Sequence, residues 1–482
     1  MTRPAIVWFR RDLRLADNPA LVEAAASGQP LIPLFIDETG VPEGEADGGA
    51  TRWWLHHSLL SLGRDLAARG VPLLLRRGEP LAVLEALVAA TGATRVLWNR
   101  RYTPRGVVQD TTIKAALTRH GIEVRSFKAG LLFEPWEIAT RSGTPFRVFT
   151  PFWRSCLAAP PPDRPLPPPA ALRPCESVPP GDDLGSWRLL PTAPDWAGGL
   201  NADWQPGEAG AEARLQIFLD QRLKAYAVAR DLPGQAGTSR LSPHLAFGEI
   251  SPRRAFHAAR DAAGSGNGLD RFLAELGWRE FCAHLLFTVP DLPEQPLRGE
   301  FAAFPWRDDP ELLVAWQRGR TGFPLVDAGM RELWTTGWMH NRVRMVVASF
   351  LVKDLLLSWR LGADWFRDTL VDADLASNVA SWQWVAGCGA DAAPFFRIFN
   401  PTLQGEKFDP DGRYVRRWCP ELAGLPDRWL HQPGRASDII LRQAGVSLGR
   451  SYPHPIVDHD VARRRALAAM ENCHGGEGSE SR

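Results

Sequence analysis

The sequence predicts an α/β amino-terminal domain with a parallel, Rossmann-like sheet, followed by a long linker and an all-α domain. Short apolar runs alternate with helical patterns first, a proline-rich stretch follows, and only helical patterns continue after it. We place the α/β domain at residues 1–130, the linker at 131–208 and the helical domain at 209–474. Residues 475–482 are small and polar, which predicts a disordered tail.

Short apolar runs containing β-branched residues are the expected strands of the first domain. They cover residues 5–9, 30–36, 72–75 and 95–98, with helical patterns at 52–69 and 81–91. Alternating strands and helices form parallel sheets, whose ligands bind beyond the carboxyl ends of the strands. RRDLRLADN (10–18), Asp37-Glu38 and NRRYTP (99–104) lie there. No G-x-G-x-x-G follows the first strand, so a dinucleotide fingerprint is missing.

The linker is predicted from its prolines. APPPDRPLPPPAALRP, at 159–174, can form neither a helix nor a central strand. Helical patterns then cover residues 211–230, 253–263, 270–287, 310–317 and 325–335. These patterns predict a second, helical domain.

Composition excludes several classes of protein. The net charge of the 482 residues is +1, so any affinity for nucleic acid must come from a local patch. Six Cys without a CxxC pair argue against a disulfide scaffold and a thiolate zinc site, and fit a reducing cytoplasm. The 11 His show no metal-ligand spacing, and neither a signal peptide nor a membrane-spanning run is present, so we expect no metal and no membrane.

The segment 338–401 is the most informative part of the chain. Its first third is predicted to be a helix, on which Trp338, Asn341 and Met345 would share one face. A plain core helix would not favour the amide of Asn341.

Polar side chains crowd together further along this segment. Asp372, Asp374 and Asn378 stand close to Trp382 and Trp384, and carboxylates are costly to bury unpaired. The group could bind a polar heterocycle among aromatic rings. The alternative is a tryptophan-rich core whose acids cap helices.

Two further segments suggest binding. Thr238, Ser239 and Ser242 follow a glycine ahead of an expected helix, where hydroxyls and free amides suit phosphate, although an ordinary N-cap explains them too. In FLAELGWREF (272–281), Glu275 and Trp278 project together at i, i+3; the alternative is a buried aromatic beside an exposed acid.

Together these segments resemble the DNA photolyase and cryptochrome family, most closely the class I or class III photolyases that repair cyclobutane pyrimidine dimers. The resemblance runs from IVWFRRDLRLADNPAL to YPHPIVDH and covers nearly the whole chain. It implies one FAD, active as the reduced anion, that transfers an electron under blue light to a dimer flipped out of DNA. The expected FAD residues are Tyr226, Thr238, Ser239, Arg240, Leu241, Ser242, Phe272, Glu275, Arg279, Trp338, Asn341, Arg344, Asp372, Asp374 and Asn378. The family often has Trp at the position of Phe272.

The resemblance also implies roles in catalysis and DNA binding. Trp278 and Trp384 would hold the dimer, Glu275 would bond its 5′ base, Met345 would pack beneath it, and Asn378 would face flavin N5. Residues expected to contact DNA are Arg230, Glu275, Trp278, Asn341, Arg342, Met345, Trp384 and Arg397. Each Arg could instead be a solvated surface charge. Trp382, Trp359 and Trp306 align with the residues that carry electrons to the flavin.

Rival functions remain open. A (6-4) photolyase would have His in place of Asn341 and Met345, and a cryptochrome would keep FAD without repair, which TSRLSPHLAFGEIS also fits. A nucleotide-binding protein of the first domain's fold alone is a distant third. We expect an antenna chromophore, with methenyltetrahydrofolate favoured and a deazaflavin or FMN possible. The partner would be damaged DNA, bound by a cytoplasmic monomer at the nucleoid.

Overall fold

The computed structural model describes residues 3–391 and 397–475. The chain divides into two compact units. The first unit comprises residues 1–224, 239–290 and 371–376, and the second comprises 225–238, 291–370 and 377–482. The predicted boundaries at 130, 208 and 474 remain predictions. The predicted tail lies almost entirely outside the described residues.

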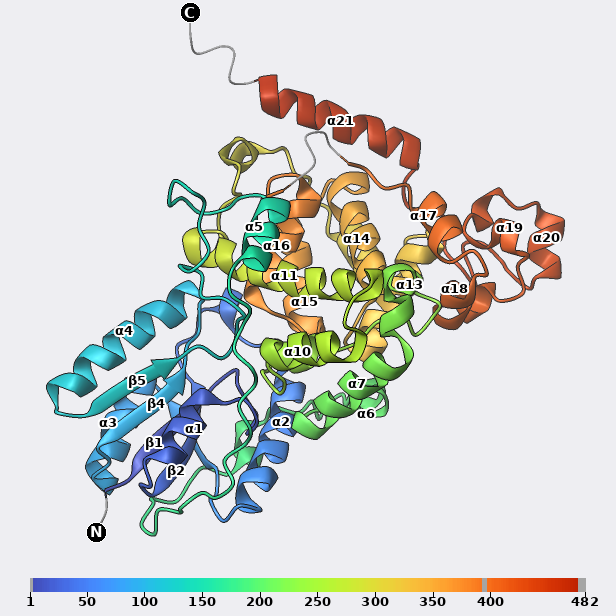
Figure 1. The fold of residues 1–482 in the computed structure, drawn as a ribbon. Coiled ribbons are helices and arrows are strands. Elements are labelled where there is room, and N and C mark those ends of the chain that lie inside the picture. The colour runs from blue at the N-terminus through green and yellow to red at the C-terminus, as the bar shows by residue number, and fades with distance from the viewer. Residues whose placement is uncertain (1–2, 392–396, 476–482) are drawn as a thin grey trace, which may run out of the picture. The chain divides into compact units, whose positions relative to one another are not determined.

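A five-stranded parallel sheet forms the core of the first unit, in the order β3-β2-β1-β4-β5. Its strands are β1 (Ala5–Phe9), β2 (Leu31–Glu38), β3 (Leu74–Gly78), β4 (Arg95–Asn99) and β5 (Glu123–Phe127), drawn as arrows in Figure 1. The helices between them are α1 (Pro19–Ala26), α2 (Gly49–Ala67), α3 (Pro80–Thr91) and α4 (Pro104–Arg119). The predicted parallel α/β sheet is confirmed, with β5 as an edge strand that was not predicted.

The chain order places a switch point between β1 and β4. Successive strands extend the sheet from β1 to β3, and the chain then returns to β4 on the other side of β1. Ligands of such sheets bind where the strand order reverses. Trp8 and Trp98, both 0% exposed, lie in this part of the sheet's core.

The rest of the first unit is mainly helical. Its helices are α5 (Phe149–Ala158), η2 (Leu184–Trp187), α6 (Gly198–Asp203), α7 (Glu208–Gln221), α9 (Ser242–Ala246), α10 (Pro252–Ala263) and α11 (Asn267–Thr288). The helices predicted at 253–263 and 270–287 are thus confirmed. The proline-rich stretch 159–174 contains no helix, whereas α5, just before it, was not predicted.

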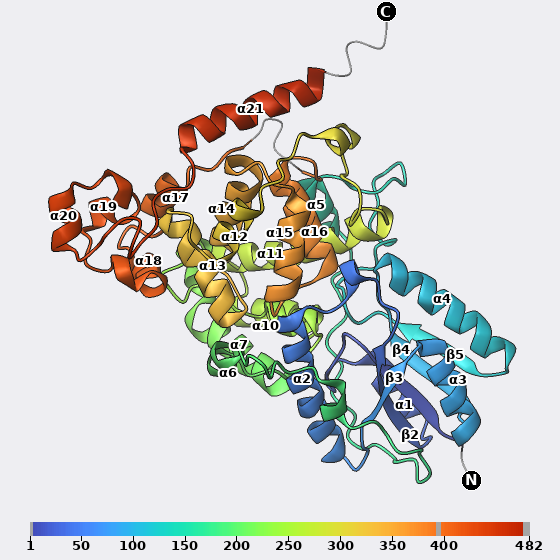
Figure 2. The same ribbon diagram turned by 180° about the vertical axis from the view of Figure 1, so that it is seen from behind.

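The second unit is mainly helical in its described part, with loops and two isolated β-bridges between the helices (Figures 1 and 2). Up to residue 386 it contains α8 (Tyr226–Ala229), η4 (Gly299–Ala303), α12 (Pro310–Gln317), α13 (Pro324–Thr336), α14 (Asn341–Ser349), the π-helix η5 (Phe350–Asp354), α15 (Trp359–Thr369) and α16 (Leu375–Ala386), whose first residues belong to the first unit. After it come α17 (Pro401–Phe408), α18 (Arg413–Trp418), η6 (Pro420–Leu422), α19 (Asp427–Leu430), η7 (Pro433–Arg435), α20 (Asp438–Gln443) and α21 (His459–Gly475).

Two helix predictions are wrong in detail. The helix expected at 211–230 is broken, because α7 ends at Gln221 and the short η3 (Leu223–Ala225) and α8 follow. Gly268 approaches the carbonyl of Leu223 so closely that a Cβ would lie 2.0 Å from its oxygen. The backbone at this break therefore packs directly on the start of α11.

The shared helical face of Trp338, Asn341 and Met345 is the second error. Gly337 ends α13 with φ +65°, and the His340 side chain caps α14 by accepting from the Arg342 amide. Trp338 thus precedes the helix, and only Asn341 and Met345 lie on it. A left-handed glycine stops a helix more firmly than apolar periodicity extends it.

Candidate functional site

Helix α11 positions the aromatic and charged residues predicted at 272–279. Gly277 lets α11 lie against α5, because a Cβ there would be 2.5 Å from Cε3 of Trp153. Phe272 is buried, with its ring 4.6 Å from Phe218. Glu275 is half-buried and faces Arg271 at 3.7 Å.

Trp278 lies face to face with a residue that the sequence analysis did not single out. Its ring centroid is 3.8 Å from that of Phe149, and the two planes differ by 9°. One face of the indole is therefore covered, while the side chain as a whole remains half-buried. A base could stack only on the part of Trp278 that Phe149 leaves open.

Arg279 is fixed by its surroundings in the first unit. It donates to the carbonyl of Gly130 at 2.6 Å and lies 3.3 Å from Glu280. Glu280 accepts from the amides of Leu132 and Phe133, at 2.7 and 3.2 Å. Burial raises the pKa of Glu280 to about 7. The sequence analysis missed Glu280, which holds residues 130–133 and α11 together.

The turn predicted to bind phosphate is divided between the units, with Thr238 in the second and residues 239–242 in the first. In the first unit, Arg240 has φ +55°, forms an ion pair with Asp203 and lies over the ring of Trp204 at 4.2 Å. Leu241 is the N-cap of α9, and no side chain caps this helix. Ser239 Oγ accepts from the Leu241 amide at 3.4 Å, so the expected side-chain cap of α9 is not formed.

In the second unit, Thr238 is half-buried and follows Gly237, where a Cβ would lie 2.3 Å from the carbonyl oxygen of Ala229. This close approach requires glycine. It fixes the path of the chain into the turn.

Helix α14 and the residues before it form a second group of predicted residues. Arg344 donates to the Met339 carbonyl at 2.7 Å and lies 5.9 Å from the ring of the buried Trp338. Asn341 is exposed at the start of the helix. His340 was not predicted, and burial lowers its pKa to about 4.

The tautomer of His340 follows from its contacts. Nδ1 accepts from the Arg342 amide, so the neutral ring carries its hydrogen on Nε2. Nε2 is buried and has no hydrogen-bond partner in the described part of the chain. A buried donor without a partner is costly, so this atom suits a bound group that offers an acceptor.

The arginines predicted to contact DNA differ in exposure. Arg342 pairs with Asp231 at 2.9 Å and lies 4.3 Å from the Phe408 ring, whereas its Nη1 is 3.9 Å from the Met345 sulfur. Arg230 is only 6% exposed and lies over Tyr226, itself buried, at 5.6 Å. Its role as a phosphate contact stays a prediction.

Arg397 is exposed and is held through its backbone. Its carbonyl accepts from the ammonium of Lys353 on the π-helix, and the nearby Phe399 amide donates to Ser349 Oγ at 3.3 Å. Burial lowers the pKa of Lys353 to about 7. Lys353 and Ser349 therefore anchor residues 397–399.

The acids and the amide predicted to hold a heterocycle lie near the start of α16. Asp372 is buried and Asp374 half-buried in the first unit. In the second unit, Asn378 donates to the Ala363 carbonyl at 2.9 Å. This bond orients a neutral amide, which cannot donate a proton as a carboxylic acid would.

Helix α16 also carries two of the predicted tryptophans. Trp382 is 2% exposed and lies 5.0 Å from Phe366 and 6.3 Å from Trp316. Trp384 is half-buried. Between them Gln383, missed by the sequence analysis, donates to the carbonyls of Leu292 and Gln295 and accepts from the Leu297 amide.

The other two predicted electron carriers lie in the same unit. Trp359 is 4% exposed at the first residue of α15. Trp306 is half-exposed and lies 4.4 Å from Phe304. Their order along a path to the flavin stays a prediction.

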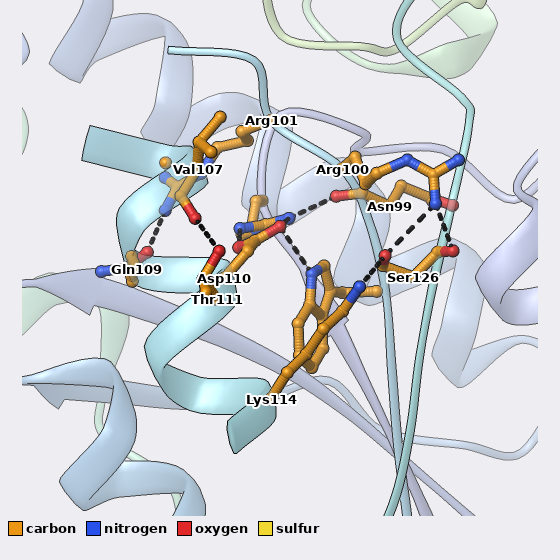
Figure 3. Close-up of polar contacts among 12 residues, drawn as sticks. Asn99, Arg100, Arg101, Val107, Gln109, Asp110, Thr111, Lys114 and Ser126 are labelled. Atoms are coloured by element: carbon orange, nitrogen blue, oxygen red, sulfur yellow. Dashed lines mark hydrogen bonds and ion pairs between the residues drawn. The ribbon is translucent and has the colours of Figure 1, made fainter. Parts of the chain in front are cut away.

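At the switch point of the sheet, side chains already fill the carboxyl end of β4. Arg10 is 4% exposed, pairs with Asp110 at 2.6 Å and lies 4.6 Å from the Trp8 ring. Figure 3 shows Asp110 and Lys114 on α4, with Lys114 reaching Ser126 of β5 at 2.6 Å. The buried Arg10–Asp110 ion pair and the Trp8 ring occupy the position where an α/β sheet usually binds its ligand.

An exposed aromatic group lies elsewhere in this unit. Trp136 is 56% exposed, 6.3 Å from the Tyr102 ring and 5.6 Å from that of Phe287, and Arg100 lies over it at 5.9 Å. The exposed part of this ring is accessible for stacking on another aromatic group.

Residues 3–391 and 397–475 contain no group of three His, Cys, Asp or Glu that could hold a metal ion. In the same residues, no helix is long and apolar enough to cross a bilayer.

Comparison with known proteins covers both halves of the chain. The family described as DNA photolyase matches residues 5–170, and the FAD binding domain of DNA photolyase matches residues 272–472. The deoxyribodipyrimidine photo-lyase of Agrobacterium fabrum is 53% identical, over 97% of this chain and 98% of its own. Cryptochrome-1 of Arabidopsis thaliana is 43% identical, over 97% of this chain and 70% of its own.

A solved structure agrees with these matches. The crystal structure of a bacterial class III photolyase from Agrobacterium tumefaciens superposes with a TM-score of 0.95 and 52% identity, over 98% of each chain. The fold, the sequence matches and their coverage lead to one conclusion. This chain belongs to the DNA photolyase and cryptochrome family.

Proposed function

We propose that the protein is a light-driven deoxyribodipyrimidine photo-lyase of the class III type, which splits cyclobutane pyrimidine dimers in DNA. The observation that carries this proposal is the 53% identity, over nearly the full length, to a protein named for that activity. Trp278, Met345 and Trp384, which the family resemblance assigns to the dimer, are all present. We further propose that it acts as a cytoplasmic monomer.

The residues present fit FAD. The hydroxyls at 238–242 do not cap α9 and are suited to bind a diphosphate. The buried Nε2 donor of His340 has no hydrogen-bond partner among the described residues and could bind an acceptor atom of the cofactor. The fifteen flavin residues predicted from the resemblance are proposed as its ligands. FAD, when bound in reduced form, supplies the electron that splits the dimer and takes it back.

The protein's own residues would then bind and orient the dimer, keep acidic protons from the flavin and hold the DNA backbone. Trp278, held by Phe149, would stack on the extruded dimer, and stacking on a base contributes about 1–3 kcal/mol. Glu275 would accept a hydrogen bond from the 5′ base, and Asn378 would keep acidic protons away from the flavin. Exposed Arg397 would contact backbone phosphate without reading sequence.

The test is light-driven repair of a duplex that contains one cyclobutane dimer. Reduced protein under blue light should restore the intact pyrimidines, whereas the dark control should not. An absorption spectrum of the purified protein should show one flavin per chain. A flavin-loaded protein that binds dimer-containing and undamaged duplexes equally and repairs neither would favour a photoreceptor function.

For the antenna, we propose a folate, methenyltetrahydrofolate, that stacks on the exposed ring of Trp136, beside the buried Tyr102 and the half-buried Phe287. A deazaflavin or FMN in the switch point would have to displace the buried Arg10 and Asp110 pair. Adding each pigment to the purified protein should give energy transfer to the flavin with the folate, and Trp136→Ala should weaken its binding. Saturable binding of deazaflavin or FMN instead would refute this assignment.

A further inference from the structure

The segment before and within α5 has an unusual charge. Residues 138–162 include Arg141, Arg147 and Arg154 but no Asp or Glu, although the whole chain has a net charge of only +1. All three arginines are exposed. None of them has an ion pair in the part of the chain that the structure describes.

Helix α5 is held rigidly in the first unit by its aromatic residues. Phe149 stacks on Trp278, Phe152 lies 5.3 Å from Phe281, and Trp153 fills the space left by Gly277. The inner face of α5 is thus buried on α11. Arg154 remains on the exposed side.

The loop that leads into α5 is fixed by a histidine. Nδ1 of His284 lies 3.2 Å from the Pro135 carbonyl, and Nε2 lies 3.2 Å from the Phe146 amide. A neutral ring satisfies both bonds, with the hydrogen on Nδ1, and burial lowers the pKa of His284. Arg147 follows Phe146 directly, so its backbone is anchored.

We propose that Arg141, Arg147 and Arg154 form a contact surface for the phosphate backbone of duplex DNA beside Trp278. This inference rests on the proposed function, which brings the lesion to Trp278. Arg147 is two residues from Phe149, and Arg154 is five residues, or about 7.5 Å, further along the helix. DNA that reaches the ring stacked on Phe149 therefore passes close to Arg147 and Arg154, and Arg141 lies in the loop that leads into the same helix.

The chemistry favours phosphate as the ligand. Guanidinium groups bind phosphate oxygens in a bidentate way, and unpaired exposed arginines need not break an existing ion pair first. Contacts of this kind add affinity for any duplex and carry no information about the lesion. The surface should therefore act on damaged and undamaged DNA alike.

The test replaces Arg141, Arg147 and Arg154 together by Gln in the full-length flavoprotein. Affinities for a dimer-containing and an undamaged duplex are measured over a range of salt concentrations. The slope of log K against log salt should fall in magnitude by about 0.9 for each phosphate that the variant no longer neutralises, or about 2.7 for three. Repair at saturating DNA should keep its wild-type rate, because the proposal assigns all three to the DNA backbone and none to the dimer.

The matched control removes the same charge elsewhere in the first unit. Arg3, Arg64 and Arg119 are also exposed and have no ion pair among the described residues, so their triple Gln variant should keep the wild-type slope. An unchanged slope in the α5 variant, or the same decrease in the control, would overturn the proposal. The proposal would also be overturned if the wild type bound phosphatidylserine vesicles and the α5 variant lost that binding while its affinity for DNA stayed unchanged.

The outcome can be separated from that of the proposed function. The salt dependence on undamaged duplex requires neither light nor repair. A changed slope in a protein that repairs nothing would refute the photolyase activity and keep the DNA surface. Normal repair with an unchanged slope would refute the DNA surface and keep the photolyase activity.

Discussion

Gly362 offers a direct test of how tightly Trp382 is held. Gly362 lies inside α15, and a Cβ there would be 2.1 Å from Cη2 of Trp382. Trp382 is 2% exposed and is confined by Phe366 and Trp316, so the indole cannot move away freely. Gly362→Ala should therefore force a shift of Trp382 or of α15.

Two opposing effects set the expected magnitude. Replacing Gly by Ala inside a helix stabilises by about 0.8–1 kcal/mol, whereas overpacking a core typically costs about 1–3 kcal/mol. Gly63, inside α2, has no atom within 4 Å of its added Cβ. Gly63→Ala should thus stabilise by about 1 kcal/mol, and Gly362→Ala should be less stable than that control by about 1–3 kcal/mol.

The assay is urea unfolding of both variants beside the wild type, with light-driven reduction of oxidised flavin as a second measurement. Gly362→Ala should also slow photoreduction, because it displaces the ring proposed to hand electrons to the flavin. Equal stabilisation by the two substitutions would refute the reasoning. It would mean that Trp382 is not confined against α15.

Further predictions concern electron supply, lesion binding and pH. Trp306→Phe should slow photoreduction but leave repair by chemically reduced protein nearly intact; some reduction should persist if Trp316, 6.3 Å from Trp382, provides a bypass. An absence of repair with the flavin already reduced would show another role for Trp306. Trp278→Ala should weaken binding to dimer-containing duplex by roughly 5–150-fold, and to undamaged duplex far less, in a binding titration at fixed salt. An equal decrease for both duplexes would contradict lesion stacking. The pKa of Glu280 is raised from 4.5 to about 7, so the folded state holds this proton more tightly and stability should fall as pH rises between these values, by at most about 3 kcal/mol. Glu280→Gln should flatten this part of the stability profile measured by urea unfolding, and an unchanged profile would mean that another group causes it.

Four of the five strands and several of the helices were predictable because their signals are local. Apolar runs at 5–9 and 95–98 and the helical patterns at 253–263 and 310–317 reappear almost unchanged. Strand β5 was missed because Glu123 and Arg125 interrupt its apolar character at the edge of the sheet. Helix α5 was missed because bulky aromatics and a nearby proline-rich stretch hide its period.

The full set of candidate site residues was predicted only through the family resemblance, and their roles stay predictions. Its residues come from segments far apart in the chain, and no local spacing relates Trp306 to Trp382. The supporting residues gave no sequence signal at all. Glu280, Phe149 and His340 became visible only through contacts with distant backbone and rings. Long-range packing of this kind leaves no periodic trace in a sequence.

The π-helix Phe350–Asp354 has a mechanical consequence. In it, the consecutive residues Lys353 and Asp354 are both buried and serve different segments. Lys353 holds the carbonyl of Arg397, while Asp354 binds His459 of α21 at 2.6 Å. Two adjacent residues of one widened helical turn thus bind two different segments. A displacement of the segment that carries Arg397 should therefore be transmitted to the carboxyl-terminal helix through the peptide unit that joins Lys353 to Asp354.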